Sequence, residues 1–112
     1  MRDTRPVSWT KAALKDFAAF PETVQEAALS AVTVAAEGQK ADTALKGLGG
    51  GVFEIALKHR GDAFRVVYAV QLDEAVWVVH AFQKKSKTGI ATPMPEIDLI
   101  KARLKRLKEI LV

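Results

Sequence analysis

The middle of the chain alternates between apolar and polar residues with a period of two, as a half-buried β-strand does. The segment VFEIALK (52–58) shows this alternation, and AFRVVYAVQL (63–72) repeats it after the turn residues HRGD. A third segment, AVWVVHAF (75–82), is apolar on both faces, which is typical of a central strand. Because the connections between the three segments are short, we expect an antiparallel meander.

The two ends of the chain predict helices. PVSW (6–9) is expected to form a short strand, where a proline is tolerated at an edge. TKAALKDFAAF (10–20) and PETVQEAALSAVTVAAEG (21–38) then place apolar residues at helical spacing, and Pro21 suits the first turn of the second helix. The small residues of that helix predict close packing in a helical hairpin.

The C-terminal segment PEIDLIKARLKRLKEILV (95–112) is the clearest helix. Its apolar stripe repeats at steps of three and four residues and consists of Ile97, Ile100, Leu104, Leu107 and Leu111. The other face carries the basic residues Lys101, Arg103, Lys105, Arg106 and Lys108. We expect the apolar stripe to pack on the sheet and the basic face to point outward.

The segment QKADTALKGLGGG (39–51) is expected to be a loop, because three consecutive glycines resist regular structure. A phosphate-binding role for them is the weaker interpretation, since no Walker pattern and no helix follow. We therefore predict one α+β domain over residues 1–112. It consists of a helical hairpin packed on a roughly four-stranded antiparallel sheet, with a C-terminal helix.

Composition excludes several kinds of chemistry. The 112 residues contain no cysteine, so disulfides, thiolate catalysis and cysteine-ligated zinc are excluded, and two histidines are too few for a closed histidine site. We expect neither a metal nor a small-molecule cofactor. No apolar run approaches the roughly 20 residues of a membrane span, and the polar N-terminus predicts a soluble, cytoplasmic protein without membrane contact. The net charge of +4 mildly favours an acidic partner such as nucleic acid.

A group of cations follows the apolar strand. The segment HAFQKKSKTGIATP (80–93) contains Lys84, Lys85 and Lys87 and no acidic residue. One interpretation is a solvated loop. The other is an anion site, because side chains that directly follow a central strand are held rigidly enough for electrostatic catalysis.

Two further residues have both a structural and a functional interpretation. Arg65 lies on the polar face of its strand, where it can pair with Glu54 across the sheet or grip a phosphate with two parallel donors. His80 lies in the apolar strand, where a core histidine with a satisfied hydrogen bond is favoured over a general acid or base.

Three segments together resemble the RelE/ParE toxin superfamily, and most closely its phage-derived, HigB-like branch. They are LKGLGGGVFEI (45–55), GDAFRVVYAV (61–70) and HAFQKKSKTGIATPMPEIDLI (80–100), and the likeness extends from about Phe17 to the end of the chain. The resemblance implies a type II toxin that is neutralised by a cognate antitoxin, often a helix-turn-helix protein. RelE-like and HigB-like members cleave mRNA on the ribosome, whereas ParE-like members inhibit DNA gyrase, and the shared fold does not choose between them.

The resemblance also implies roles for individual residues. Arg65 matches the arginine that RelE-like enzymes carry in this strand, and Lys84 and Lys85 match the basic residues after the next strand. Lys58 and Arg60 are candidates for a further RNA-binding position, together with Lys87. The C-terminal RLKRLKEILV has no match to the tyrosine or histidine that some members use.

These residues lead to a mechanistic hypothesis. The chain would be a ribosome-dependent mRNA endoribonuclease that uses the 2′-hydroxyl of the RNA as nucleophile, without a metal. Arg65 and Lys84 would stabilise the phosphorane. Lys85, whose neutral form is favoured by neighbouring cations, would be the base, with His80 in reserve. Two alternatives are a gyrase inhibitor of the ParE type and a non-catalytic toxin relic or antitoxin-bound regulatory protein.

Overall fold

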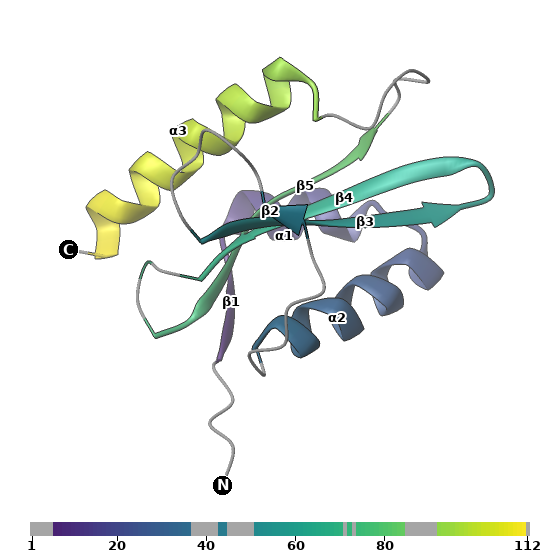
Figure 1. Ribbon diagram of the computed structural model, residues 1–112, viewed down its shortest axis with the longest axis horizontal. Helices are drawn as coiled ribbons and strands as arrows, with labels where there is room; N and C mark the ends of the chain where they lie inside the picture. The colour runs from purple at the N-terminus through teal and green to yellow at the C-terminus, as the bar shows by residue number, and fades with distance from the viewer. Residues whose placement is uncertain are drawn as a thin grey trace, which may run out of the picture.

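The computed structural model describes residues 6–36, 43–44, 51–70, 72, 74–84 and 92–111. The elements follow the predicted order, with one additional short strand in the segment that was expected to be a loop (Figure 1). They are β1 (Val7–Trp9), α1 (Lys11–Ala18), α2 (Glu22–Ala36), β2 (Thr43–Ala44), β3 (Val52–His59), β4 (Asp62–Ala69), β5 (Val76–Lys84) and α3 (Met94–Leu111).

The sheet has the strand order β1-β5-β4-β3-β2. Strands β3, β4 and β5 form the predicted antiparallel meander, and the β3–β4 hairpin turns through Arg60 and Gly61, both at positive φ. Positive φ at two central residues is the geometry that matches the twist of the flanking strands. The edge strand β1 pairs with β5 in the parallel direction, so the sheet is mixed rather than wholly antiparallel.

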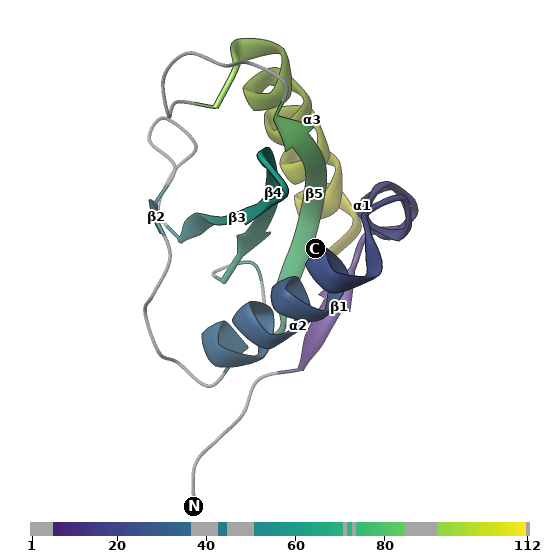
Figure 2. The ribbon, with the colours of Figure 1, turned by 90° about the vertical axis from the view of Figure 1, so that its right-hand side faces the viewer.

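Helices cover both faces of the sheet, and Figure 2 shows α3 on one side and α2 on the other. On the α1/α2 face, helix residues such as Phe17, Phe20 and Val32 pack on strand residues such as Phe64 and Val66. On the α3 face, Ile100, Leu104 and Leu107 pack on residues that include Val52, Val67 and Val79. The predicted apolar stripe of the C-terminal helix is therefore confirmed. None of the described helices is long and apolar enough to cross a bilayer.

A bulge in β5 determines which side chains face α3. Val67 lies opposite His80 and Tyr68 lies opposite Val78, so Val79 is an extra residue on β5. An extra residue interrupts the alternation of side chains between the two faces of a strand. Trp77, Val79 and Phe82 therefore all belong to the α3 side.

Candidate functional site

The pairing register gathers three of the expected cations on one face of the sheet. Lys58 lies opposite Ala63, which in turn lies opposite Lys84, and in the next row of this face Arg65 lies opposite Ala56. Directly opposed residues point to the same face, as do residues two apart along a strand. Lys58, Arg65 and Lys84 consequently surround two small alanines on the α3 face. We call these five residues the cationic platform.

The cationic platform is open to solvent at one end. Ala56 and Lys58 are exposed, Ala63 is half-buried, and the tip of the β3–β4 hairpin extends past α3 (Figure 1). Lys84 and the side chain of Arg65 lie deeper, at 6% and 11% exposure. Lys58 is therefore the accessible cation of the platform, whereas Arg65 and Lys84 are largely covered.

Arg65 forms a buried ion pair with Glu54. Its Nη1 atom donates to Glu54 Oε1, and the Thr92 hydroxyl donates to the other carboxylate oxygen. The side chains of Arg65 and Glu54 are only 11% and 6% exposed. The pairing expected as the structural interpretation of Arg65 is thus present. Removing two charges from water is costly unless they compensate each other, so the pair depends on both partners.

His80 lies outside the cationic platform, in a separate buried network. Its Nδ1 atom is 2.7 Å from Arg103 Nη1, and its Nε2 atom is 2.6 Å from Glu96 Oε1. Because a guanidinium only donates, Nδ1 accepts, and Nε2 carries the proton that is donated to Glu96. Burial lowers the pKa of His80 below 6.5, against the opposing effect of the hydrogen bond with Glu96. His80 is thus a neutral core histidine, as the favoured interpretation of the sequence holds.

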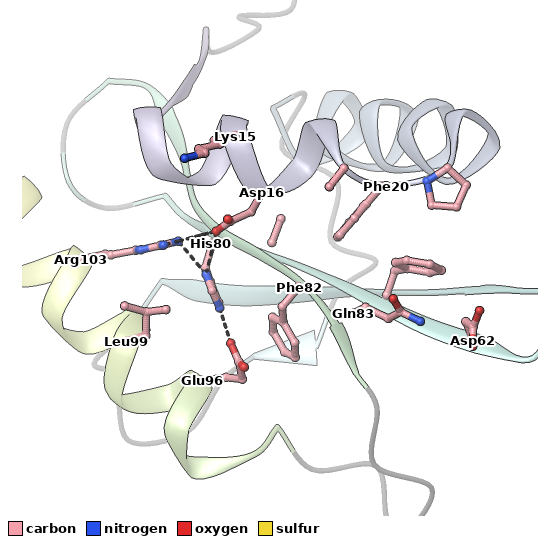
Figure 3. Close-up of a pocket in the computed structure, with 14 residues that line it drawn as sticks. Lys15, Asp16, Phe20, Asp62, His80, Phe82, Gln83, Glu96, Leu99 and Arg103 are labelled. Carbon is pink, nitrogen blue, oxygen red and sulfur yellow. Dashed lines mark hydrogen bonds and ion pairs between the residues drawn. The ribbon is translucent and has the colours of Figure 1, made fainter.

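Arg103 links this network to the part of the β5 edge that β1 leaves unpaired. Strand β1 pairs with β5 only as far as Val78, and beyond this point the side chain of Arg103 donates to the carbonyl oxygen of Val79 at 3.2 Å. The same guanidinium reaches Asp16 on α1 with both terminal nitrogens, each at 3.3 Å (Figure 3). The expectation that Arg103 belongs to the outward basic face of the helix is therefore wrong. The Arg103 side chain points inward because it hydrogen-bonds the carbonyl oxygen of Val79 at the unpaired edge of β5.

A pocket of about 770 Å³ lies between α1 and α3 along this edge. It is drawn in Figure 3, and its charged lining residues are Lys15, Asp16, Asp62, Glu96 and Arg103. Three carboxylates against two cations disfavour a phosphate here. The cationic platform is therefore the better place for a phosphodiester.

The structure brings together only part of the predicted site. Arg65, Lys84 and Lys58 meet at the cationic platform, and Arg60 lies at the exposed tip of the adjacent hairpin. Lys85 and Lys87 lie outside the described residues. Sequence reasoning missed Thr92, because no sequence pattern indicates that its hydroxyl lies beside Glu54 in the folded chain. Among the described residues no group of acidic or histidine side chains is arranged to hold a metal ion.

Comparison with known proteins adds a family and a fold. Residues 15–105 match the family described as Phage derived protein Gp49-like (DUF891). The structure resembles the free state of a double-arginine mutant of the E. coli toxin RelE, with a TM-score of 0.66 and 19% identity over 94% of this chain and 99% of that one. It also resembles a chain of the RelBE2 toxin–antitoxin complex of Mycobacterium tuberculosis, with a TM-score of 0.54 and 17% identity over 77% of this chain and 98% of that one. A search of curated proteins gave no significant match.

Proposed function

Because this chain belongs to the phage-derived Gp49-like family, which is of the RelE/ParE toxin type, we propose that it is the toxin of a toxin–antitoxin pair and cleaves mRNA on the ribosome. The reaction is transfer of the scissile phosphate to the adjacent 2′-oxygen. It needs a group that accepts the 2′ proton, positive charge around the phosphorane, and a proton for the departing 5′-oxygen.

The cationic platform is the observation that carries this proposal. Lys58 and Lys84 lie on strands separated by one other strand, so their backbones are roughly 10 Å apart, twice the usual strand spacing. The exposed side chain of Lys58 can extend over that distance toward the more deeply placed Lys84. Arg65 lies on the intervening strand β4, in the row next to the two lysines, and its guanidinium offers donors at fixed positions. Positive groups that are already in place where negative charge develops are an effective form of catalysis.

Glu54 supplies the proton acceptor in this proposal. Its carboxylate is held by Arg65 and already accepts a hydrogen bond from the hydroxyl of Thr92. A substrate 2′-hydroxyl that displaced the Thr92 hydroxyl would donate its hydrogen bond to the same oxygen of Glu54. The proton then moves from the 2′-oxygen to Glu54 as the 2′-oxygen attacks phosphorus, and the 5′-oxygen leaves with a proton from a neighbouring cation or water.

His80 has no part in this chemistry. Both ring nitrogens are occupied, by Arg103 and by Glu96, in a network that lies outside the cationic platform. A base must reach the proton that it removes. His80 instead positions α3 against β5, and the ribosome is the partner that would orient the RNA over the cationic platform.

Primer extension on an mRNA, with and without ribosomes, tests the proposal. Lys58→Gln removes an exposed cation without disturbing the core, and Lys84→Gln removes the deeper one. Each is expected to slow cleavage on the order of 10²-fold, by analogy with the loss of one oxyanion donor. Lys101→Gln, on the exposed face of α3, is the matched control and should cleave normally.

Wild-type cleavage rates in both platform variants would defeat the assignment of the site. Absence of ribosome-dependent cuts by the wild-type protein, together with inhibition in a DNA supercoiling assay, would replace the endoribonuclease with a gyrase inhibitor.

A further inference from the structure

A second concave surface lies near the C-terminal end of α3. It has a volume of about 440 Å³ and is formed where β1, the start of α1, β5 and α3 meet. Its apolar lining includes Trp9, Trp77, Leu107 and Ile110, and its rim includes Lys11 and Arg106. We call it the tryptophan groove. It is built from the beginning of β5, whereas the cationic platform is built at the strand's other end.

The tryptophan groove exposes apolar side chains to solvent. Ile110 is 67% exposed, although the neighbouring Leu107 is buried in the core. Both tryptophans are half-buried: the Trp9 ring packs on Phe17, with ring centroids 4.7 Å apart, and Trp77 packs on the α3 side of the sheet. Apolar pockets of a few hundred Å³ with a few polar groups at the rim are typical of binding sites.

Charge limits what can occupy the tryptophan groove. Arg103 also lines it and is engaged by Asp16, whereas Lys11 and Arg106 have no ion-pair partner among the described residues. No acidic side chain is among the described lining residues. An occupant that brings carboxylates would therefore meet only positive charge at the rim. A cationic occupant would be repelled.

We propose that the tryptophan groove binds an acidic, amphipathic segment of a partner protein. Aliphatic side chains of the segment would enter between Trp9, Trp77 and Ile110, and its carboxylates would lie on Lys11 and Arg106. The inference rests on the proposed function only in identifying that partner as the antitoxin. A single-stranded RNA fits less well, because it brings a phosphate with every base to a surface with a largely apolar floor.

The chain supplies its own reporter for this site. Its only two tryptophans are Trp9 and Trp77, and both line the tryptophan groove. Intrinsic tryptophan emission therefore reports on the groove directly. The probe is a short peptide of aspartate, glutamate and leucine, with the leucines at helical spacing and without tryptophan or tyrosine.

The expected result is a saturable blue shift of the emission when the peptide is titrated into the full chain. The double variant Arg106→Glu/Ile110→Glu should weaken binding by more than tenfold, since both residues are exposed and neither contributes to the core. The matched double variant Lys101→Glu/Lys105→Glu makes the same kind of charge change on the exposed face of α3 and should bind as the wild type does.

Four outcomes would overturn the proposal. They are no saturable shift with the peptide, an equal shift with a peptide in which serine replaces leucine, saturation by an oligouridylate instead of the peptide, and an emission change that depends on protein concentration alone. The third would make the groove an RNA site and the fourth a contact between copies of the chain. Primer extension with the wild-type protein is a separate readout, so a missing ribonuclease activity and a missing groove interaction are distinguishable.

Discussion

The ion pair between Arg65 and Glu54 allows a quantitative test of how a buried charge is held beside the cationic platform. The test replaces Glu54 with Leu, Arg65 with Met, and then both together. Each single replacement leaves one charge at about a tenth exposure or less without its partner. Breaking a buried pair in this way typically costs about 3–5 kcal/mol. Domains are typically stable by only about 5–15 kcal/mol, so each single variant should be strongly destabilised.

The double variant shows how much of each single loss comes from leaving one charge without its partner. Replacing both charges with apolar side chains removes the uncompensated charge, so the double variant should recover most of the free energy of unfolding that either single variant loses. In a chain of 112 residues, a loss of about 3–5 kcal/mol lowers the melting temperature by on the order of 12–20 °C. The coupling energy from the double-mutant cycle should be of the same order as one single loss.

Urea unfolding, followed by tryptophan emission, measures the free energy of unfolding of the wild type, the two single variants and the double variant. Additive losses in the double variant, or single losses below about 1 kcal/mol, would refute the reasoning, because both would mean that the two charges are well solvated. Cleavage is then compared at a temperature where every variant is folded. The double variant should be inactive although it is stable, because it lacks both the acceptor and the guanidinium.

Three further predictions concern other parts of the molecule. Ala56→Glu places a carboxylate on the floor of the cationic platform and should reduce cleavage at least tenfold while changing the unfolding midpoint little, since Ala56 is exposed; normal cleavage would show that no phosphate approaches this surface. The pKa of His80 is lowered in the folded state, so the unfolded chain binds more protons and the free energy of unfolding should fall as pH decreases below about 6.5. His80→Gln should remove this pH dependence. Identical pH profiles of the two proteins in urea unfolding would contradict the prediction. Arg103→Lys cannot reach Asp16, His80 and the Val79 carbonyl together and should cost about 1–3 kcal/mol, to be compared in thermal unfolding with the exposed Lys105→Arg.

Local patterns predicted most of the elements. Alternation placed Arg65 on the face opposite Phe64 and Val66, and the structure shows this arrangement. The Arg65–Glu54 pair could also be anticipated, because the two residues lie on adjacent strands and on the same face. These features depend on periods of two or on steps of three and four residues, which are properties of the chain itself.

Features that depend on distant segments could not be predicted in the same way. The parallel pairing of β1 with β5 joins residues some 70 positions apart, and nothing in PVSW specifies its direction. Arg103 shares its helix with several exposed basic residues, so its periodicity alone places it outward. Its inward position follows from an unpaired carbonyl at the edge of β5, which exists only because β1 is short.

The extra residue in β5 makes the site depend on a count as well as on residue types. If Val79 were kept but paired regularly with Val67, with the pairing of Trp77 unchanged, every later residue of the strand would change face, and Lys84 would point toward α1 and α2 instead of toward Arg65. A relative without the bulge would keep its lysine on the α3 face only if its strand were one residue shorter, so an alignment without a gap here would match residues that point to opposite faces. Comparisons within the family are therefore informative about this site only when the bulge and the number of residues between Trp77 and Lys84 are considered together.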